Sequence, residues 1–240
     1  QDKIDKPEDN PVCYTFGYLK GKNAGDSEQK AYSGVVNIFD AHILLFPVHS
    51  LAGPVWVSTA ERLQDVGFTV PNTPPEDKIL TTFKGHTRLN LGWLMLDVAG
   101  QATITAPANW QGAAWNAVKK RIVLVSASLF GQIVNSNLEV RTSVAINPVT
   151  GAAEEGALYT YEAIPRATFL TAEVALDDYR QAFPENERWN SPLEVVRAGL
   201  QMIEYLGVGG MGTRGFGRMR IIGDPVEKNP LAEISQEAQA

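Results

Sequence analysis

The sequence predicts a fold in which α-helices and β-strands are mixed. Short runs rich in β-branched and aromatic residues recur along the chain, as buried strands require. Between them lie segments with helical spacing, one of which carries clear start and stop signals. A chain of 240 residues is long enough for one large domain or two small ones with a real core.

The first part of the chain is predicted to be a charged loop followed by strands. Residues 1–12 contain two prolines and are typical of a loop or tail. The run 35–46 suggests one or two buried strands, and the part before Asp40 could pair with the part after it. The next stretch, "GPVWVSTAERLQDVGF", begins as a strand edge and becomes a short helix whose N-cap is Ser58 or Thr59.

The middle of the chain alternates between strand and helix. The proline-rich stretch "VPNTPPEDK" is a loop, and "RLNLGWLMLDVAGQATI" has strand character again. A helix is predicted near 110–120, then the strand "RIVLVS", then a helix that starts at Ser126 or Ser128.

The last third predicts a hairpin, a strand, a capped helix and a final strand. The turn "NPVTG" joins two strand-like runs within about 135–165, and "ATFLTAEVAL" follows as a core strand. Ser191 as N-cap, Pro192 at N1 and Glu194 at N3 form a capping box, and Gly207 ends the helix. The stretch "GRMRII" is then expected to be the last strand.

Composition narrows the possible functions. The net charge of −6 argues against nonspecific coating of nucleic acid over the whole surface. The lone cysteine, Cys13, excludes an internal disulfide and fits a reducing cytoplasm. The three histidines lack metal-ligand spacing, so no metal site is predicted from them. No apolar run approaches the roughly 18 residues that a membrane span needs.

The stretch 207–217, "GVGGMGTRGFG", contains the pattern G-x-G-x-x-G. A dinucleotide-binding turn requires a strand before the glycines and a helix after them, and here the predicted order is reversed. Within 207–220 the charged residues are Arg214, Arg218 and Arg220, with no acid. Glycine main chain beside guanidinium groups could hold a phosphodiester backbone, while the composition alone is equally compatible with a solvated loop.

Three stretches, in order, resemble one protein family. They are "FDAHILLFPVHSLAGPVWVST", the hairpin "LEVRTSVAINPVTGAAEEGALYTYEAIP" and the glycine-rich loop between a capped helix and a strand. Together they resemble the RAMP superfamily, and within it the crRNA-backbone subunit of the type III-B CRISPR (Cmr) effector complex. The resemblance implies an α+β fold, a modified ferredoxin-like or RRM-like RAMP domain with a projecting β-hairpin thumb.

The resemblance also implies a function. Copies of such a subunit stack along a crRNA as a helical filament, together with other Cmr-type subunits, and the complex cleaves bound target RNA at regular spacing with Mg²⁺. The RNA-binding positions carried over are as follows: His49, Ser50, Arg141, Thr142, Gly209, Gly210, Met211, Gly212, Thr213 and Arg214. His49 stands where the family usually has Arg, and a neutral histidine lacks the fixed charge and the two-pronged hydrogen bonding of Arg.

The resemblance also implies a missing part. The family pattern begins with a strand, an aspartate-bearing loop and a helix, and the chain 1–240 starts after them, so we expect a single RAMP domain that lacks its N-terminal part. Asp5 does not match the catalytic loop, and the catalytic residue stays unknown. Since a sheet without a central strand has an unpaired edge, we expect a separate chain or segment to supply it.

Other functions remain open at this stage. The chain could be a purely structural crRNA-binding subunit, or a crRNA-processing RAMP endonuclease that uses His42 or His49 as a base. Asp40, Glu155 and Glu162 are the remaining carboxylate candidates for RNA cleavage. An unrelated enzyme would need Cys13 or a Ser50–His49 pair, but neighbouring residues on a strand point to opposite faces.

Overall fold

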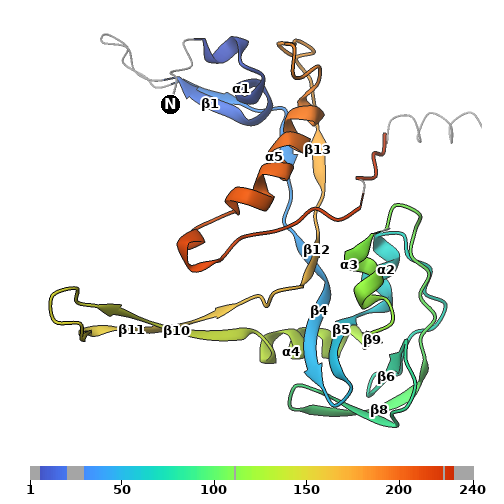
Figure 1. The fold of residues 1–240 in the computed structure, drawn as a ribbon. Helices are drawn as coiled ribbons and strands as arrows, with labels where there is room; N and C mark the ends of the chain where they lie inside the picture. Colours follow the sequence, from blue (N-terminus) through green and yellow to red (C-terminus); the bar gives the residue numbers. More distant parts are fainter. Residues whose placement is uncertain (1–5, 21–29, 111, 224, 230–240) are drawn as a thin grey trace, which may run out of the picture. The chain divides into compact units, whose positions relative to one another are not determined.

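The computed structural model describes residues 6–20, 30–110, 112–223 and 225–229, and these form two compact units. The first unit is drawn from Gln1–Ala41 and Ala172–Ile221, and the second from His42–Thr171 and the residues from Ile222 on. Each unit contains helices and strands, so the predicted α+β class is confirmed (Figure 1). The number of folding domains in the chain stays a prediction.

The second unit is built around a seven-stranded mixed sheet in the order β12-β4-β5-β9-β6-β8-β7. β5 and β9 are parallel, as are β6 and β8, whereas the other neighbours are antiparallel. The strands are β4 (His42–Ser50), β5 (Gly53–Ser58), β6 (Lys78–Thr81), β7 (Arg88–Leu91), β8 (Leu94–Gln101), β9 (Ile122–Leu124) and β12 (Phe169–Thr171).

Helices cover both faces of this sheet. Helix α4 (Ala127–Ser136) packs Phe130 and Ile133 on one face, and α2 (Ala60–Asp65) and α3 (Ala113–Val118) pack Leu63 and Trp115 on the other. Alternation along the strands sends side chains to both layers, which is why these strands read as continuous apolar runs. Each fully buried Leu or Phe contributes about 1.5–3 kcal/mol, so two such layers supply most of the favourable free energy of folding.

The predicted helix starts in this unit are largely confirmed. The Thr59 hydroxyl accepts a hydrogen bond from the amide of Arg62 at 3.3 Å, which makes Thr59 the N-cap of α2. Ser126 precedes α4, although its hydroxyl donates to the Glu76 carbonyl and does not cap the helix. The stretch 88–101 proves to be a hairpin of β7 and β8, because a two-residue turn interrupts the predicted strand.

A long two-stranded ribbon continues from α4 (Figure 1). It consists of β10 (Glu139–Ile146) and β11 (Ala153–Ala163), paired antiparallel with a register shift between Val144 and Ile146. The predicted turn is confirmed: the side chain of Asn147 accepts hydrogen bonds from the amides of Val149 and Thr150 at 2.9 and 3.2 Å.

The first unit joins segments from both ends of the described chain. The 3₁₀ turn η1 (Pro7–Asp9) leads into α1 (Pro11–Phe16), and α1 packs against the long helix α5 (Pro192–Leu206). Its strands form two-stranded pairs, β1 (Gly17–Lys20) with β2 (Lys30–Ser33) and β3 (Val36–Ile38) with β13 (Val174–Leu176). The 3₁₀ turn η2 (Gly212–Arg214) lies in the glycine-rich loop.

Arg180 links α1 and β2 of this unit to its own segment. Its guanidinium donates hydrogen bonds to the carbonyls of Tyr14 and Ser33 at 3.1 and 2.9 Å, and it lies 4.3 Å from the centre of the Tyr14 ring. The arginine thereby satisfies a carbonyl near the end of α1 and one at the end of β2, and stacks on an aromatic ring.

Four local predictions are wrong, each for a physical reason. Part of the predicted loop 1–12 is helical: Pro7–Asp9 form a 3₁₀ turn, and α1 begins at Pro11 because the Asn10 side chain caps the amides of Val12 and Cys13. The segments on either side of Asp40 do not pair with each other, since β3 pairs with β13. The expected strand 167–176 is divided between β12 and β13, which belong to different sheets. The stretch 217–222 is not a strand, and the amide of Ile221 donates instead to the Glu204 side chain.

Candidate nucleic-acid interface

The glycine-rich loop follows a helix whose ends are set as the sequence predicts. The Ser191 hydroxyl accepts a hydrogen bond from the Glu194 amide, and Pro192 occupies the first turn of α5. At the other end Gly207 has a φ of 72°, and its amide donates to the Ile203 carbonyl at 2.9 Å. The glycine-rich loop therefore begins at a helix end whose backbone is held by a hydrogen bond.

A backbone hydrogen bond joins the two ends of this loop at Val208 and Gly217, which we call its neck. The Val208 amide donates a hydrogen bond to the Gly217 carbonyl at 3.0 Å. Gly217 has a φ of 74°, and a Cβ at this position would collide with the Val208 carbonyl. A Cβ at Gly207 would lie 3.1 Å from the Gly217 carbonyl group. These two glycines are therefore required by backbone packing within the loop itself.

The tip of the loop is different. A Cβ added at Gly209, Gly210 or Gly212 would meet no protein atom within 4 Å among the described residues. Met211 is left-handed with a φ of 63°, and its carbonyl accepts a hydrogen bond from the Arg214 amide at 2.9 Å. The tip thus presents main chain with little side chain, held by a short 3₁₀ turn. Gly209 has a φ of 73°, which favours glycine, whereas Gly210 and Gly212 have neither a positive φ nor a close contact among the described residues that requires glycine.

The three arginines near the loop have different surroundings. Arg218 donates from its guanidinium to the Glu204 carbonyl at 3.2 Å, so it satisfies a carbonyl in the last turn of α5 and opposes the helix dipole. Arg214 is exposed and belongs to η2 at the tip, and Arg220 is exposed in the segment that follows. Arg214 is therefore the cation that the loop itself carries next to its bare main chain.

The hairpin carries the predicted positions Arg141 and Thr142 on opposite faces. Arg141 lies across from Tyr161, and its Nε is 2.7 Å from a carboxylate oxygen of Glu139. This hydrogen bond raises the pKa of Arg141 further above its usual value, so the guanidinium stays charged. Thr142 lies across from Thr160, with the two hydroxyl oxygens 3.2 Å apart.

The other face of the hairpin is open and carries apolar side chains next to polar ones. It pairs Val140 with Glu162, Thr142 with Thr160, and Val144 with Leu158. Val140 and Leu158 are 64% and 68% exposed, although apolar side chains of this size are usually buried. A two-stranded ribbon is marginally stable in water, so this face is suited to being covered by a ligand or partner.

His49 and Ser50 lie at the end of β4, on opposite sides of the strand. His49 is exposed, whereas Ser50 is buried and its hydroxyl donates to the Gly53 carbonyl at 2.6 Å. The same hydroxyl accepts from the Ala52 amide at 3.2 Å, so Ser50 holds the β4–β5 turn together. The structure therefore presents the His49 side chain to solvent and explains why the two residues cannot act as a dyad.

The neighbouring β7–β8 turn was not singled out from the sequence. Its tip residue Trp93 is 74% exposed, and the Gly92 amide donates to the His49 carbonyl at 3.3 Å. The asparagine before it, Asn90, accepts a hydrogen bond from the Leu51 amide at 2.7 Å. A sequence signal was present, since glycine followed by an aromatic residue interrupts the apolar run "RLNLGWLML".

The remaining catalytic candidates are not brought together. Asp40, Glu155 and Glu162 are exposed, and the described part of the chain contains no group of three or more His, Cys, Asp or Glu side chains that could hold a metal. Burial raises the pKa of the Cys13 thiol, which disfavours the reactive thiolate. Asp5 lies outside the described residues.

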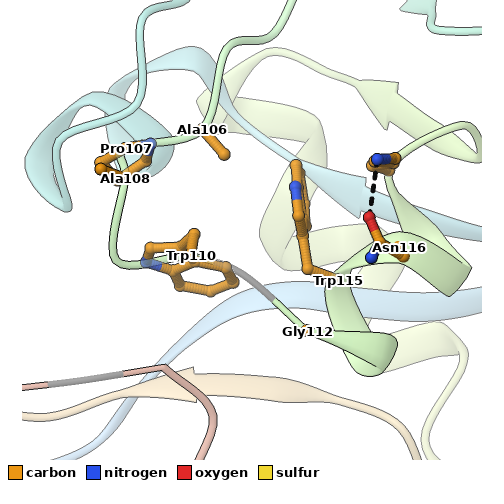
Figure 2. Close-up of a pocket in the computed structure, with 8 residues that line it drawn as sticks. Ala106, Pro107, Ala108, Trp110, Gly112, Trp115 and Asn116 are labelled. Carbon is orange, nitrogen blue, oxygen red and sulfur yellow. Dashed lines mark hydrogen bonds between the residues drawn. The ribbon is translucent and has the colours of Figure 1, made fainter.

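A shallow pocket in the second unit has aromatic walls (Figure 2). The rings of Trp110 and Trp115 lie 5.7 Å apart and nearly perpendicular, and both also contact Phe68. The polar groups that line it include Asn116 and Lys119, which hydrogen-bond to each other at 2.6 Å. No carboxylate, histidine or thiol is among the described residues that line this pocket, so it holds no candidate acid, base or nucleophile.

A helix–strand fold with a glycine loop and an open hairpin is the class that the sequence resemblance predicts. The family model of the RAMP superfamily matches residues 1–220. This chain therefore belongs to the RAMP superfamily. Within the described residues, no helix has both the length and the apolar character needed to cross a bilayer.

Solved structures with a similar fold include type III-B Cmr proteins. A chain of the cryo-EM structure of type III-B Cmr-beta in the apo state is 15% identical, with a TM-score of 0.51, over 89% of this chain and 76% of that chain. In the cryo-EM structure of Cmr-beta bound to cognate target RNA the values are 16%, 0.52, 88% and 75%. For oligomeric Cmr4 from Pyrococcus furiosus they are 18%, 0.49, 77% and 71%. A search of curated protein sequences gave no match.

Proposed function

We propose that this chain is a crRNA-binding backbone subunit of a type III-B CRISPR effector complex in the cytoplasm. The observation that carries the proposal is the glycine loop, whose neck is closed while the Cβ positions of its tip glycines face open space. In this proposal the second unit contains the sheet of a modified ferredoxin-like RAMP domain, and β10–β11 is its thumb.

The loop tip has the chemistry of a phosphate cradle. Bare main chain lets a ribose-phosphate backbone approach closely, and backbone amides with a nearby guanidinium donate to phosphate oxygens. The residues proposed to do this are Gly209, Gly210, Met211, Gly212, Thr213 and Arg214. Such contacts bind every sequence about equally, and base pairing between guide and target supplies the specificity.

The hairpin is suited to a different contact. Between residues 139 and 163 it carries one arginine and four glutamates, so its charge does not favour the phosphate backbone. Its exposed Val140, Val144 and Leu158 instead favour apolar contact with bases or with a neighbouring protein. We therefore propose that Arg141 and Thr142, near the base of the hairpin, contact nucleobases of the guide RNA.

The proposed partners follow from this arrangement. They are the crRNA, complementary target RNA, other copies of this chain and other Cmr-type subunits. Support for RNA comes from a chain of similar fold in the structure of Cmr-beta bound to cognate target RNA.

Mg²⁺-dependent target cleavage is the less supported half of the proposal. The described carboxylates do not form a metal-binding cluster, so no cleavage step is derived for them. The alternative is a purely structural crRNA-binding subunit. A processing endonuclease would use His42 or His49, which are both exposed at opposite ends of β4.

Binding is tested with two tip glycines and a matched control. Gly210→Ala and Gly212→Ala introduce a methyl group that meets no protein atom within 4 Å, at residues without a positive φ. We expect each to weaken binding of a fluorescent single-stranded RNA about fivefold, which corresponds to one lost hydrogen bond of about 1 kcal/mol. Gly199→Ala in α5 is equally free of clashes and should leave affinity unchanged. Wild-type affinity in both tip variants would overturn the cradle.

Cleavage is tested on the full chain assembled with guide and a complementary target RNA. Products at regular intervals that require Mg²⁺ would support an active subunit, and intact target would favour the structural alternative. If substitution of His42 and His49 instead abolished maturation of a guide precursor, the processing alternative would replace the proposal.

A further inference from the structure

Trp93 is exposed, whereas the other tryptophan side chains are at least partly buried. All five tryptophans are among the described residues, and the other four are buried or half-buried. The Trp93 side chain is 74% exposed, at the tip of the two-residue turn between β7 and β8. A large aromatic side chain that is left in water at a turn tip is suited to contact with a ligand or partner.

The turn that carries Trp93 is firmly held. Leu91 pairs with Leu94 across it, and Gly92 has a φ of 66°, a conformation that suits glycine at the first position of a tight hairpin turn. The Asn90 side-chain amide donates to the Gly92 carbonyl at 3.0 Å, while its oxygen accepts from the Leu51 amide at 2.7 Å. The indole therefore starts from an ordered backbone, which lowers the entropy lost on binding.

On one side this turn contacts the end of β4. The Gly92 amide donates to the carbonyl of His49 at 3.3 Å, and the His49 side chain is exposed. Arg121 donates from its guanidinium to the Ala52 carbonyl in the same β4–β5 turn. His49 thus lies beside this turn, and the Arg121 guanidinium lies at the β4–β5 turn, where its charge can attract phosphate groups.

On the other side the turn contacts the root of the hairpin. A Cβ at Gly92 would collide with the side-chain amide of Asn137. Asn137 ends α4, where its side chain donates to the Ile133 carbonyl at 2.8 Å, and β10 begins two residues later at Glu139. The turn therefore contacts the end of β4 and Asn137, which precedes the hairpin, and the sequence resemblance predicts RNA contacts at the end of β4 and in the hairpin.

We propose that Trp93 is a base-stacking residue, which holds a nucleobase of the bound RNA between the end of β4 and the root of the β10–β11 hairpin. This inference rests on the proposed RNA-binding function. An aromatic face accepts any base, so the residue adds affinity without adding sequence preference. It is also uncharged, so its contribution is independent of salt, unlike that of the loop arginine.

The test compares Trp93→Ala, Trp93→Phe and the control Tyr205→Ala in full-length protein with a fluorescent single-stranded RNA of mixed sequence. Tyr205 is 79% exposed on α5 and matches Trp93 in exposure and aromatic character. We expect Trp93→Ala to weaken binding roughly 5- to 150-fold, as the loss of one base–aromatic stack does, with an unchanged salt slope. Trp93→Phe should retain most of the affinity, and RNA-induced quenching of tryptophan fluorescence should fall in both Trp93 variants.

The outcomes separate this inference from the proposed function. If Gly210→Ala weakens binding while Trp93→Ala binds like the wild type, the loop cradle stands and base stacking by Trp93 is rejected. If Trp93→Ala changes the oligomeric state of the RNA-free protein and leaves RNA affinity unchanged, Trp93 contacts a second copy and the inference is also rejected. Wild-type protein that binds no RNA would overturn both. Circular dichroism melts of the variants check that they are folded, which is expected for an exposed side chain.

Discussion

The amide of Val208 and the carbonyl of Gly217 form a 3.0 Å hydrogen bond that closes the base of the glycine-rich loop. This bond requires the backbone of Gly217 to pass so close to Val208 that no side chain fits between them. The loop is therefore a closed structure with a defined entry and exit, although its composition alone is equally typical of a flexible connector. The glycines at its base and at its tip serve different purposes, and mutations can separate them.

Gly217→Ala should open the base of the loop. The new Cβ would collide with the Val208 carbonyl, and the φ of 74° disfavours alanine, so we expect a local cost of roughly 1–3 kcal/mol. Hydrogen exchange of the Val208 amide should accelerate, while the amides of the sheet in the second unit keep their protection. The control Gly199→Ala should not accelerate exchange at Val208. Unchanged protection in Gly217→Ala would show that the hydrogen bond does not hold the loop.

Arg214→Ala and Arg218→Ala should have different effects although they remove the same charge. Arg214 lies on the loop tip, so its loss should weaken RNA binding for all sequences and reduce the slope of log affinity against log salt by about 0.7–1. Arg218 donates to the Glu204 carbonyl, so its loss should mainly destabilise the end of α5. Affinity titrations at several salt concentrations measure the first effect, and thermal melts the second. Equal salt slopes for Arg214→Ala and wild type would count against the cradle.

Tyr14→Phe should make stability less sensitive to alkaline pH. Burial raises the pKa of Tyr14, and its hydrogen bond to Asp178 raises it further, while the Ala182 amide and Arg180 lower it in part. The folded state therefore favours the neutral phenol: its stabilising effect is complete below the unfolded pKa of about 10 and is lost as pH rises from there through the folded pKa.

Urea denaturation of wild type and Tyr14→Phe between about pH 8 and 12 measures this difference. At neutral pH the variant should be less stable by roughly 1.5–3 kcal/mol, because a hydrogen bond to a charged group is lost. Its curve should then approach that of the wild type as pH rises. Tyr205→Phe, at an exposed position, should follow the wild type throughout. Parallel curves for wild type and Tyr14→Phe would contradict the raised pKa.

Cys13 should react slowly with alkylating reagents. Burial raises the pKa of its thiol, so less thiolate is present at neutral pH than in a free cysteine. Iodoacetamide labelling at pH 7.5, followed by mass spectrometry, should be slower than for the same protein in denaturant. Cys13→Ala should retain RNA affinity. Fast labelling of the folded protein would reopen the interpretation of Cys13 as a nucleophile.

Local signals in the sequence were sufficient for several elements. The capped helix from Pro192 to Leu206, the turn after Ile146 and the N-cap at Thr59 all depend on residues within a few positions of one another. Pairings between distant segments could not be predicted in the same way. Nothing near Val36 indicates that its strand pairs with the one ending at Leu176, and the expected strand at 167–176 is divided because two different sheets share it.

In the candidate site, too, some features follow from local sequence signals and others depend on distant contacts. Gly207 as the end of α5 follows from local rules, but the roles of Gly217 and Gly210 differ only because of which backbone passes nearby. Ser50 and His49 are adjacent in sequence, and strand geometry alone places them on opposite faces. Trp93 was missed because the exposure of an apolar residue depends on the three-dimensional neighbours of its turn, here Asn90 and Asn137.

The first unit is assembled from segments that are far apart in the chain, and this has a consequence for synthesis on the ribosome. Tyr14 and Asp178, which hydrogen-bond to each other, are separated by 164 positions. Six of the seven strands of the large sheet end by Leu124, so most of that sheet can form before Asp178 leaves the ribosome. The emerging α1 must then wait, with its apolar side unprotected, until α5 leaves the exit tunnel. Chaperone dependence and aggregation during expression should therefore be governed by this unit.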